Sequence, residues 1–97
     1  MGFVQIIEYR TSDIDGIRKV GEEWEAAAEG QSTARRRVIC EDKDNPGHYM
    51  TIVFFDSHES AMENSNNAVT QEFSQKMTAL ADGEPTFYNL EIIDDRS

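Results

Sequence analysis

Every strand-like segment of this sequence carries apolar side chains at both odd and even positions, and this feature constrains the fold more than any other. Residues 48–55 show the pattern most clearly, because Ile52 and Phe54 lie on one face of an extended chain while Val53 and Phe55 lie on the other. Three more segments repeat the pattern with fewer apolar residues, at 3–10, 33–43 and 86–93. Both faces of the resulting sheet are therefore expected to be covered.

Two helical segments separate these strands. Residues 14–28 place apolar side chains, among them Trp24, at spacings of three and four, which is typical of an amphipathic helix. Capping side chains precede it at 11–13, and Gly30 is its expected end.

The second helical segment spans 57–80, with Asp56 or Ser57 as its cap. An interruption is predicted at 64–67, where four residues that favour turns follow one another. After this interruption Thr70 is the predicted cap of the resumed helix.

The elements follow in the order strand, helix, strand, strand, helix, strand. This is the ferredoxin-like βαββαβ pattern, an α+β fold in which right-handed crossovers place both helices on one face of a four-stranded antiparallel sheet. The short turn at 44–47 makes the two middle strands a hairpin. The other face has no helices, and because it is apolar a second copy of the chain is the expected cover. The length indicates one domain over residues 1–97.

Composition argues against several classes of partner. With 19 acidic and 9 basic residues the formal net charge is −10, which disfavours nucleic acid and anionic membranes. No stretch approaches the ~20 apolar residues of a membrane span. Cys40 is the only cysteine, and its apolar neighbours predict a buried thiol rather than a reactive one. The first residues do not have the pattern of a signal peptide, so a cytoplasmic location is expected.

Two junctions resemble a known family. The run Asp56-Ser57-His58-Glu59-Ser60-Ala61 follows an apolar strand directly, and Asp82-Gly83-Glu84-Pro85 precedes the last strand. Together with the order of elements over nearly the whole chain, they resemble the dimeric α+β barrel superfamily, and within it the antibiotic-biosynthesis-monooxygenase-like domains. The resemblance implies a homodimer in which two sheets form a closed barrel, with a cleft in each copy between its own sheet and helices. It also implies a small hydrophobic or aromatic ligand.

Two residues are candidates for catalysis in such a cleft. His58 lies in the first turn of the second helix, where the helix dipole favours the neutral imidazole that a general base requires. Its alternative interpretation is an exposed residue at a helix start. Arg37 is the candidate partner for an enolate or another oxyanion. The alternative for the arginine run 35–37 is ion pairing with Glu8, Glu41 or Glu91 on neighbouring strands, or extension of the charged groups into solvent at a sheet edge.

Four further residues are candidates for substrate binding. Trp24 on the first helix would form a flat wall for an aromatic ligand, with Phe73 and Met77 on the second helix as the facing wall. Asn64, at the predicted helix interruption, would offer a polar group to the ligand. The alternative is that the three apolar side chains belong to the core.

The sequence predicts no metal and no cofactor. His48 and His58 are separated by a whole strand, and no glycine-rich phosphate loop is present. His48 starts a strand directly after a turn, so it is expected to be exposed rather than functional. The leading hypothesis is a cofactor-independent monooxygenase acting on an aromatic or polyketide-like compound, a reaction type implied by the family resemblance. The alternative is a non-catalytic dimer that binds a ligand or has a structural role. Haem binding or degradation is a third hypothesis implied by the resemblance. It is weakened because haem-degrading members of the family rely on an Asn, whereas the first strand of this chain offers Gln5 and no Asn.

Overall fold

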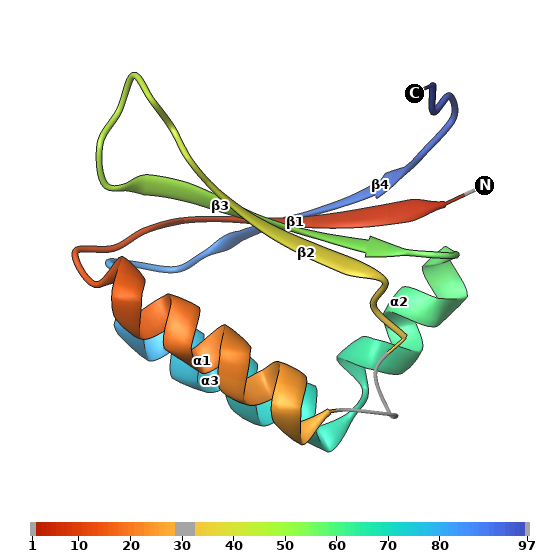
Figure 1. The fold of residues 1–97 in the computed structure, drawn as a ribbon, viewed down its shortest axis with the longest axis horizontal. Coiled ribbons are helices and arrows are strands. Elements are labelled where there is room, and N and C mark those ends of the chain that lie inside the picture. Colours follow the sequence, from red (N-terminus) through yellow and green to blue (C-terminus); the bar gives the residue numbers. More distant parts are fainter. Residues whose placement is uncertain (1, 29–32, 97) are drawn as a thin grey trace.

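The computed structural model describes residues 2–28 and 33–96, and it confirms the α+β fold (Figure 1). Within this part of the chain, four antiparallel strands form a sheet of order β2-β3-β1-β4. The elements are β1 (Phe3–Arg10), α1 (Ile14–Ala27), β2 (Arg36–Glu41), β3 (His48–Phe55), α2 (His58–Ser65), α3 (Ala68–Leu80) and β4 (Thr86–Glu91). The edge strands β2 and β4 are shorter than expected, because fewer of their residues meet partners on β3 and β1.

Polar side chains cap the helices at the predicted places, with one exception. Asp13 accepts a hydrogen bond from the backbone of Gly16 before α1, and Ser57 accepts one from Ser60 before α2. The predicted interruption is confirmed, since α2 ends at Ser65 and α3 begins at Ala68. The cap of α3 is not Thr70 but Asn67, whose side chain accepts from Val69 at 2.9 Å. Gly30, the expected end of the first helix, lies outside the described residues.

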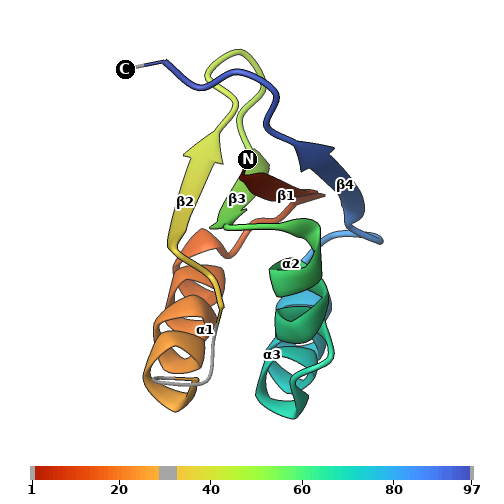
Figure 2. The same cartoon turned by 90° about the vertical axis from the view of Figure 1, so that its right-hand side faces the viewer.

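All three helices lie on one side of the sheet (Figures 1 and 2). In Figure 2, α1 lies beneath the β2 side of the sheet, and α2 and α3 lie beneath the β4 side. The buried cluster on this helix-covered face is formed by Phe3, Val53, Phe55 and Ala61, so it is concentrated where α2 meets the sheet. None of the helices in the described ranges combines the length and apolar character of a membrane span.

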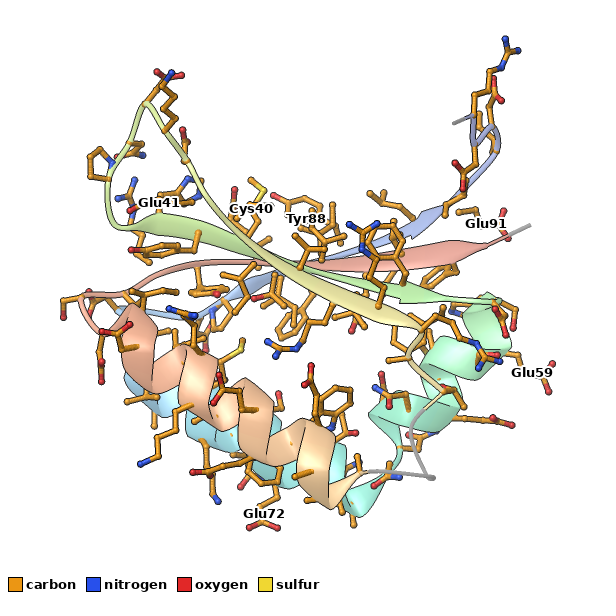
Figure 3. The ribbon with its side chains drawn as sticks, viewed as in Figure 1. Cys40, Glu41, Glu59, Glu72, Tyr88 and Glu91 are labelled. Atoms are coloured by element: carbon orange, nitrogen blue, oxygen red, sulfur yellow. The ribbon has the colours of Figure 1, made fainter. Side chains whose placement is uncertain are left out.

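In the described structure, the opposite face of the sheet carries further apolar side chains and no helix. Antiparallel pairing brings Val4 beside Phe54 and Ile6 beside Ile52 on this helix-free face. Figure 3 shows Cys40 and Tyr88 projecting from the sheet on the side away from the helices. The expectation of a buried thiol is wrong, because Cys40 shares the parity of this face and is exposed.

Candidate functional site

A cavity of about 480 Å³ lies between the helix-covered face of the sheet and the three helices. The strands supply its floor, α1 and α3 supply two walls, and α2 contributes to one end. The cavity exists because α3 packs mainly on α1 and contributes no buried residue of its own. Its size suits a small organic ligand.

Five of the six predicted site residues line this one cavity. They are Trp24 on α1, Arg37 on β2, Asn64 on α2, and Phe73 and Met77 on α3. The predicted aromatic walls therefore lie on two helices that pack against each other, and both belong to the cavity. Asn64 is 6% exposed, and its side chain lies at the α2 end.

The sixth predicted residue, His58, does not line the cavity. It is the first residue of α2, it is exposed, and its ring packs edge-on against Phe3 with centroids 5.1 Å apart. The physical reason is that α2 starts directly after β3, at the margin of the sheet beyond the cavity floor. The interpretation of His58 as an exposed helix-start residue describes its position better than a role as base.

A hydrogen bond between two helices orients Trp24. Its indole Nε1–H donates to Oγ1 of Thr70 on α3 at 3.0 Å, and both residues line the cavity. This bond joins α1 to α3 across the wall and satisfies the one polar atom of an otherwise apolar side chain. The indole is thus held in a single orientation at the cavity surface.

The arginine run forms ion pairs, but not with the strand residues expected from the sequence. Arg37 donates through Nε and Nη2 to Oε1 of Glu25 on α1, at 3.3 and 3.1 Å. Arg35 donates to Asp56 at 2.9 and 2.6 Å, and Arg36 lies over the ring of Phe54. The expected partners lie on strands, whereas the observed ones lie on α1 and in the loop after β3. The sequence does not show which helix or loop approaches β2.

A hydrogen-bonded pair beside the floor was missed by the sequence analysis. The buried hydroxyls of Tyr9 and Thr51 lie 2.9 Å apart, and Thr51 lines the cavity. Burial raises the pKa of Tyr9, while the hydrogen bond to Thr51 and the charge of Arg37 act in the opposite direction. Thr51 shares the parity of Val53, and this shared parity could have identified it.

Uncharged polar side chains make up much of the remaining lining. They come from all parts of the cavity: Gln5, Ser65, Thr70, Gln71, Ser74 and Gln75. Among the described lining residues, Arg37 is the only one with an ionisable side chain. The cavity can therefore surround an apolar ligand, donate hydrogen bonds to its oxygens, and stabilise one negative charge.

The second histidine lies away from the cavity, in contact with two carboxylates. His48 places Nε2 at 3.1 Å from Glu8 and Nδ1 at 3.2 Å from Asp42. The expectation that it is exposed is wrong, since its side chain is 16% exposed. In the described part of the chain, no group of three or more His, Cys, Asp or Glu residues is placed to hold a metal ion.

Comparisons with known proteins find likeness in structure rather than in sequence. No protein-family model matches the chain, and no curated protein matches it. SnoaB, a cofactor-independent oxygenase from Streptomyces nogalater, superposes with a TM-score of 0.79 at 10% identity, over 97% of this chain and 95% of SnoaB. Rv0793 from Mycobacterium tuberculosis gives 0.77 at 12% identity, over 100% of both chains.

A candidate antibiotic biosynthesis monooxygenase from Nitrosomonas europaea gives a TM-score of 0.76 at 8% identity, over 95% of this chain and 90% of that one. Such identities establish a shared fold and leave the activity to the site. The expected resemblance is confirmed at that level: this chain has the ferredoxin-like α+β fold of the antibiotic biosynthesis monooxygenase structures.

Proposed function

We propose that this protein binds a planar aromatic compound in the cavity and oxygenates it without a cofactor. The observation that carries the proposal is a cavity with aromatic walls and a single cation in an otherwise uncharged lining. Trp24 and Phe73 are suited to contact the ring system, and Met77 adapts to its edge. Asn64 and Arg37 would contact ligand oxygens. SnoaB, which shares the fold, is described as a cofactor-independent oxygenase.

The chemistry requires a substrate that supplies its own electrons. A ring CH₂ group that is conjugated with a carbonyl, directly or across the ring, loses a proton to give an enolate, and the enolate transfers electrons to O₂. A new C–O bond forms, return of the proton gives a hydroperoxide, and loss of water leaves a second carbonyl, so that CH₂ and O₂ become C=O and H₂O. Arg37 would stabilise the enolate oxygen, and such stabilisation is strongest where the bound ligand excludes water.

The proton acceptor in this scheme is solvent hydroxide rather than a side chain. The described lining contains no carboxylate and no imidazole, and His58 lies outside it. Substrates whose CH₂ is already acidic are therefore favoured. Reaction rates should rise with pH as more of the substrate ionises.

The helix-free face supports a homodimer as the functional form. Tyr88 and Leu90 on β4 are 43% and 44% exposed, and the same face carries apolar side chains from β1 and β3. A second copy that packs sheet against sheet would remove these surfaces from water. Leu90→Asp should shift sedimentation from dimer to monomer, whereas Glu72→Gln on the outer surface of α3 should not (Figure 3). A wild-type chain that sediments as an 11.0 kDa monomer at high concentration would contradict the dimer.

The test of the function uses 1,8-dihydroxyanthrone, a planar tricyclic phenol with an acidic CH₂ group. Trp24 is the only tryptophan in the chain, so quenching of its fluorescence reports binding at the cavity wall directly. We expect saturable quenching, O₂ consumption above that of the buffer, and a quinone product detected by mass spectrometry. Arg37→Gln should reduce the rate more than the affinity, because the full negative charge develops only during the reaction.

A second candidate function, a non-catalytic binding protein, is favoured by the absence of a general base among the described lining residues. It predicts saturable quenching with no O₂ consumption above the buffer rate. Haemin offers a further control, since an intense Soret band on mixing would indicate haem binding instead. Absence of quenching by either compound would contradict the proposed aromatic ligand.

A further inference from the structure

We propose that Gly21 and Glu25 are positioning residues that hold the guanidinium of Arg37 at the cavity wall, so that the cavity selects ligands with an anionic oxygen. The two residues lie one turn apart on α1, at positions i and i+4, and therefore on one side of the helix. This inference rests on the proposed binding function of the cavity. It adds the charge of the preferred ligand and the residues that determine it.

Glu25 fixes the direction of the Arg37 side chain. Nε and Nη2 both donate to Oε1 of Glu25, so the pair is oriented through two bonds rather than one. The side chain of Arg37 is 17% exposed and that of Glu25 is 55% exposed. Glu25 is thus the more solvent-exposed partner of the pair, and of the two residues only Arg37 lines the cavity.

Gly21 leaves the space that the guanidinium occupies. A Cβ at position 21 would lie 2.7 Å from Cζ of Arg37 and 2.8 Å from Nη2, which is too close for either atom to stay in place. Glycine inside a helix is less favourable than alanine, so its presence at this position calls for a reason. Close approach of the guanidinium to the helix backbone supplies that reason.

The remaining nitrogen, Nη1, is available to a ligand. In the described structure no hydrogen bond or ion pair reaches Nη1. No buried side-chain nitrogen of the described residues lacks a partner, so Nη1 must retain accessible surface. It lies next to Gly21, and both residues line the cavity. Arg37 also borders an outer groove with Glu22 and Glu25, and we assign the accessible surface of Nη1 to the cavity rather than to that groove. A ligand oxygen in the cavity would then accept a charge-assisted hydrogen bond from Nη1.

Two ligands of nearly equal shape but different charge separate the effect of ligand charge on affinity from the effect of ligand shape. Calorimetric titration at neutral pH would compare 2-naphthoate, which carries a carboxylate, with neutral 2-naphthamide. For the wild type we expect 2-naphthoate to bind about tenfold more tightly, the size expected for one charge-assisted hydrogen bond. The ratio of the two affinities is the readout, so general changes in the cavity cancel.

Gly21→Ala should reduce this ratio toward one while leaving the protein folded. The added methyl displaces only the end of a flexible side chain, and alanine favours the helix. Glu25→Gln should also reduce the ratio, because a neutral amide orients the guanidinium less strongly. Glu23→Gln makes the same change of charge on the same helix, two residues before Glu25 and outside the cavity lining, and should keep the wild-type ratio.

The outcomes distinguish this inference from the proposed function. If both probes bind to the wild type with equal affinity, the inference is wrong and the aromatic cavity stands. If the ratio is large and Gly21→Ala does not change it, the helix residues do not position Arg37. If neither probe binds and Trp24 fluorescence is unaffected by 1,8-dihydroxyanthrone, the proposed binding function itself fails.

Discussion

The two faces of the sheet are built from the same kinds of side chain but have different surroundings. On the helix-covered face Phe55 is 4% exposed and belongs to the buried cluster, while on the helix-free face its neighbour Phe54 is only partly buried. The helix-covered face also contains a cavity, because α1 and α3 pack on each other and leave part of the sheet beneath them open. Apolar composition therefore predicts that a face will be covered, but not what covers it or how completely.

Truncation of the two adjacent phenylalanines tests most sharply whether the two faces of the sheet differ in how far their side chains are buried. Phe55→Ala should lower the free energy of unfolding by about 3–5 kcal/mol, because it leaves a void in the buried cluster. Phe54→Ala should cost about 1–2 kcal/mol in dilute protein, because the ring already contacts water and loses only part of its burial. Urea unfolding followed by circular dichroism measures both values.

Unfolding of the two variants at several protein concentrations also tests for the dimer. If a second copy covers the helix-free face, the cost of Phe54→Ala should grow with concentration, while that of Phe55→Ala should change less. Equal costs for the two substitutions in dilute protein would contradict the difference between the faces.

Much of the fold could be predicted because its determinants are local. The bounds of β1 and β3 follow from alternation and strand propensity, and the starts of α1 and α2 follow from Asp13 and Ser57, whose capping bonds lie within one turn. The bounds of β2 could not be predicted in this way, because they depend on its pairing with β3, which covers Arg36 to Glu41 only.

The candidate site likewise contains some residues that local signals predict and others that only the tertiary structure reveals. Trp24 could be predicted because the apolar stripe of its helix must face the sheet. The position of His58 could not, because its distance from the cavity depends on where β3 ends relative to the helices. Glu25 and Gly21 carry no local signal of their role, which depends on contact with a strand that follows later in the chain.

A smaller effect is expected where two helices meet above the cavity. Thr70→Val removes the acceptor of the Trp24 indole N–H and should lower the free energy of unfolding by about 1 kcal/mol. Trp24 emission should move to shorter wavelength, because its polar partner is lost. Thr78→Val makes the same change on the same helix, where the hydroxyl bonds to the backbone of Ser74 and to no other described residue, and where it does not line the cavity. Equal emission shifts in both variants would mean that Thr70 does not orient the indole.

The smallest expected effect lies at the end of the sheet opposite the buried cluster, where Asp42 contacts His48. The hydrogen bond to His48, followed by that from the backbone of Asp44, lowers the pKa of Asp42. A carboxyl whose pKa is lower in the folded state stabilises the fold above its unfolded-state pKa, about 4, and this contribution is lost as pH falls through the folded-state value. Asp42→Asn should therefore lower the midpoint of thermal unfolding slightly at neutral pH, and the difference from wild type should shrink in acid. Asp44→Asn, which removes a nearby exposed carboxylate with no side-chain partner in the described structure, should show no such dependence on pH. A difference that persists unchanged into acid would show that the charge of Asp42 is not what stabilises the turn.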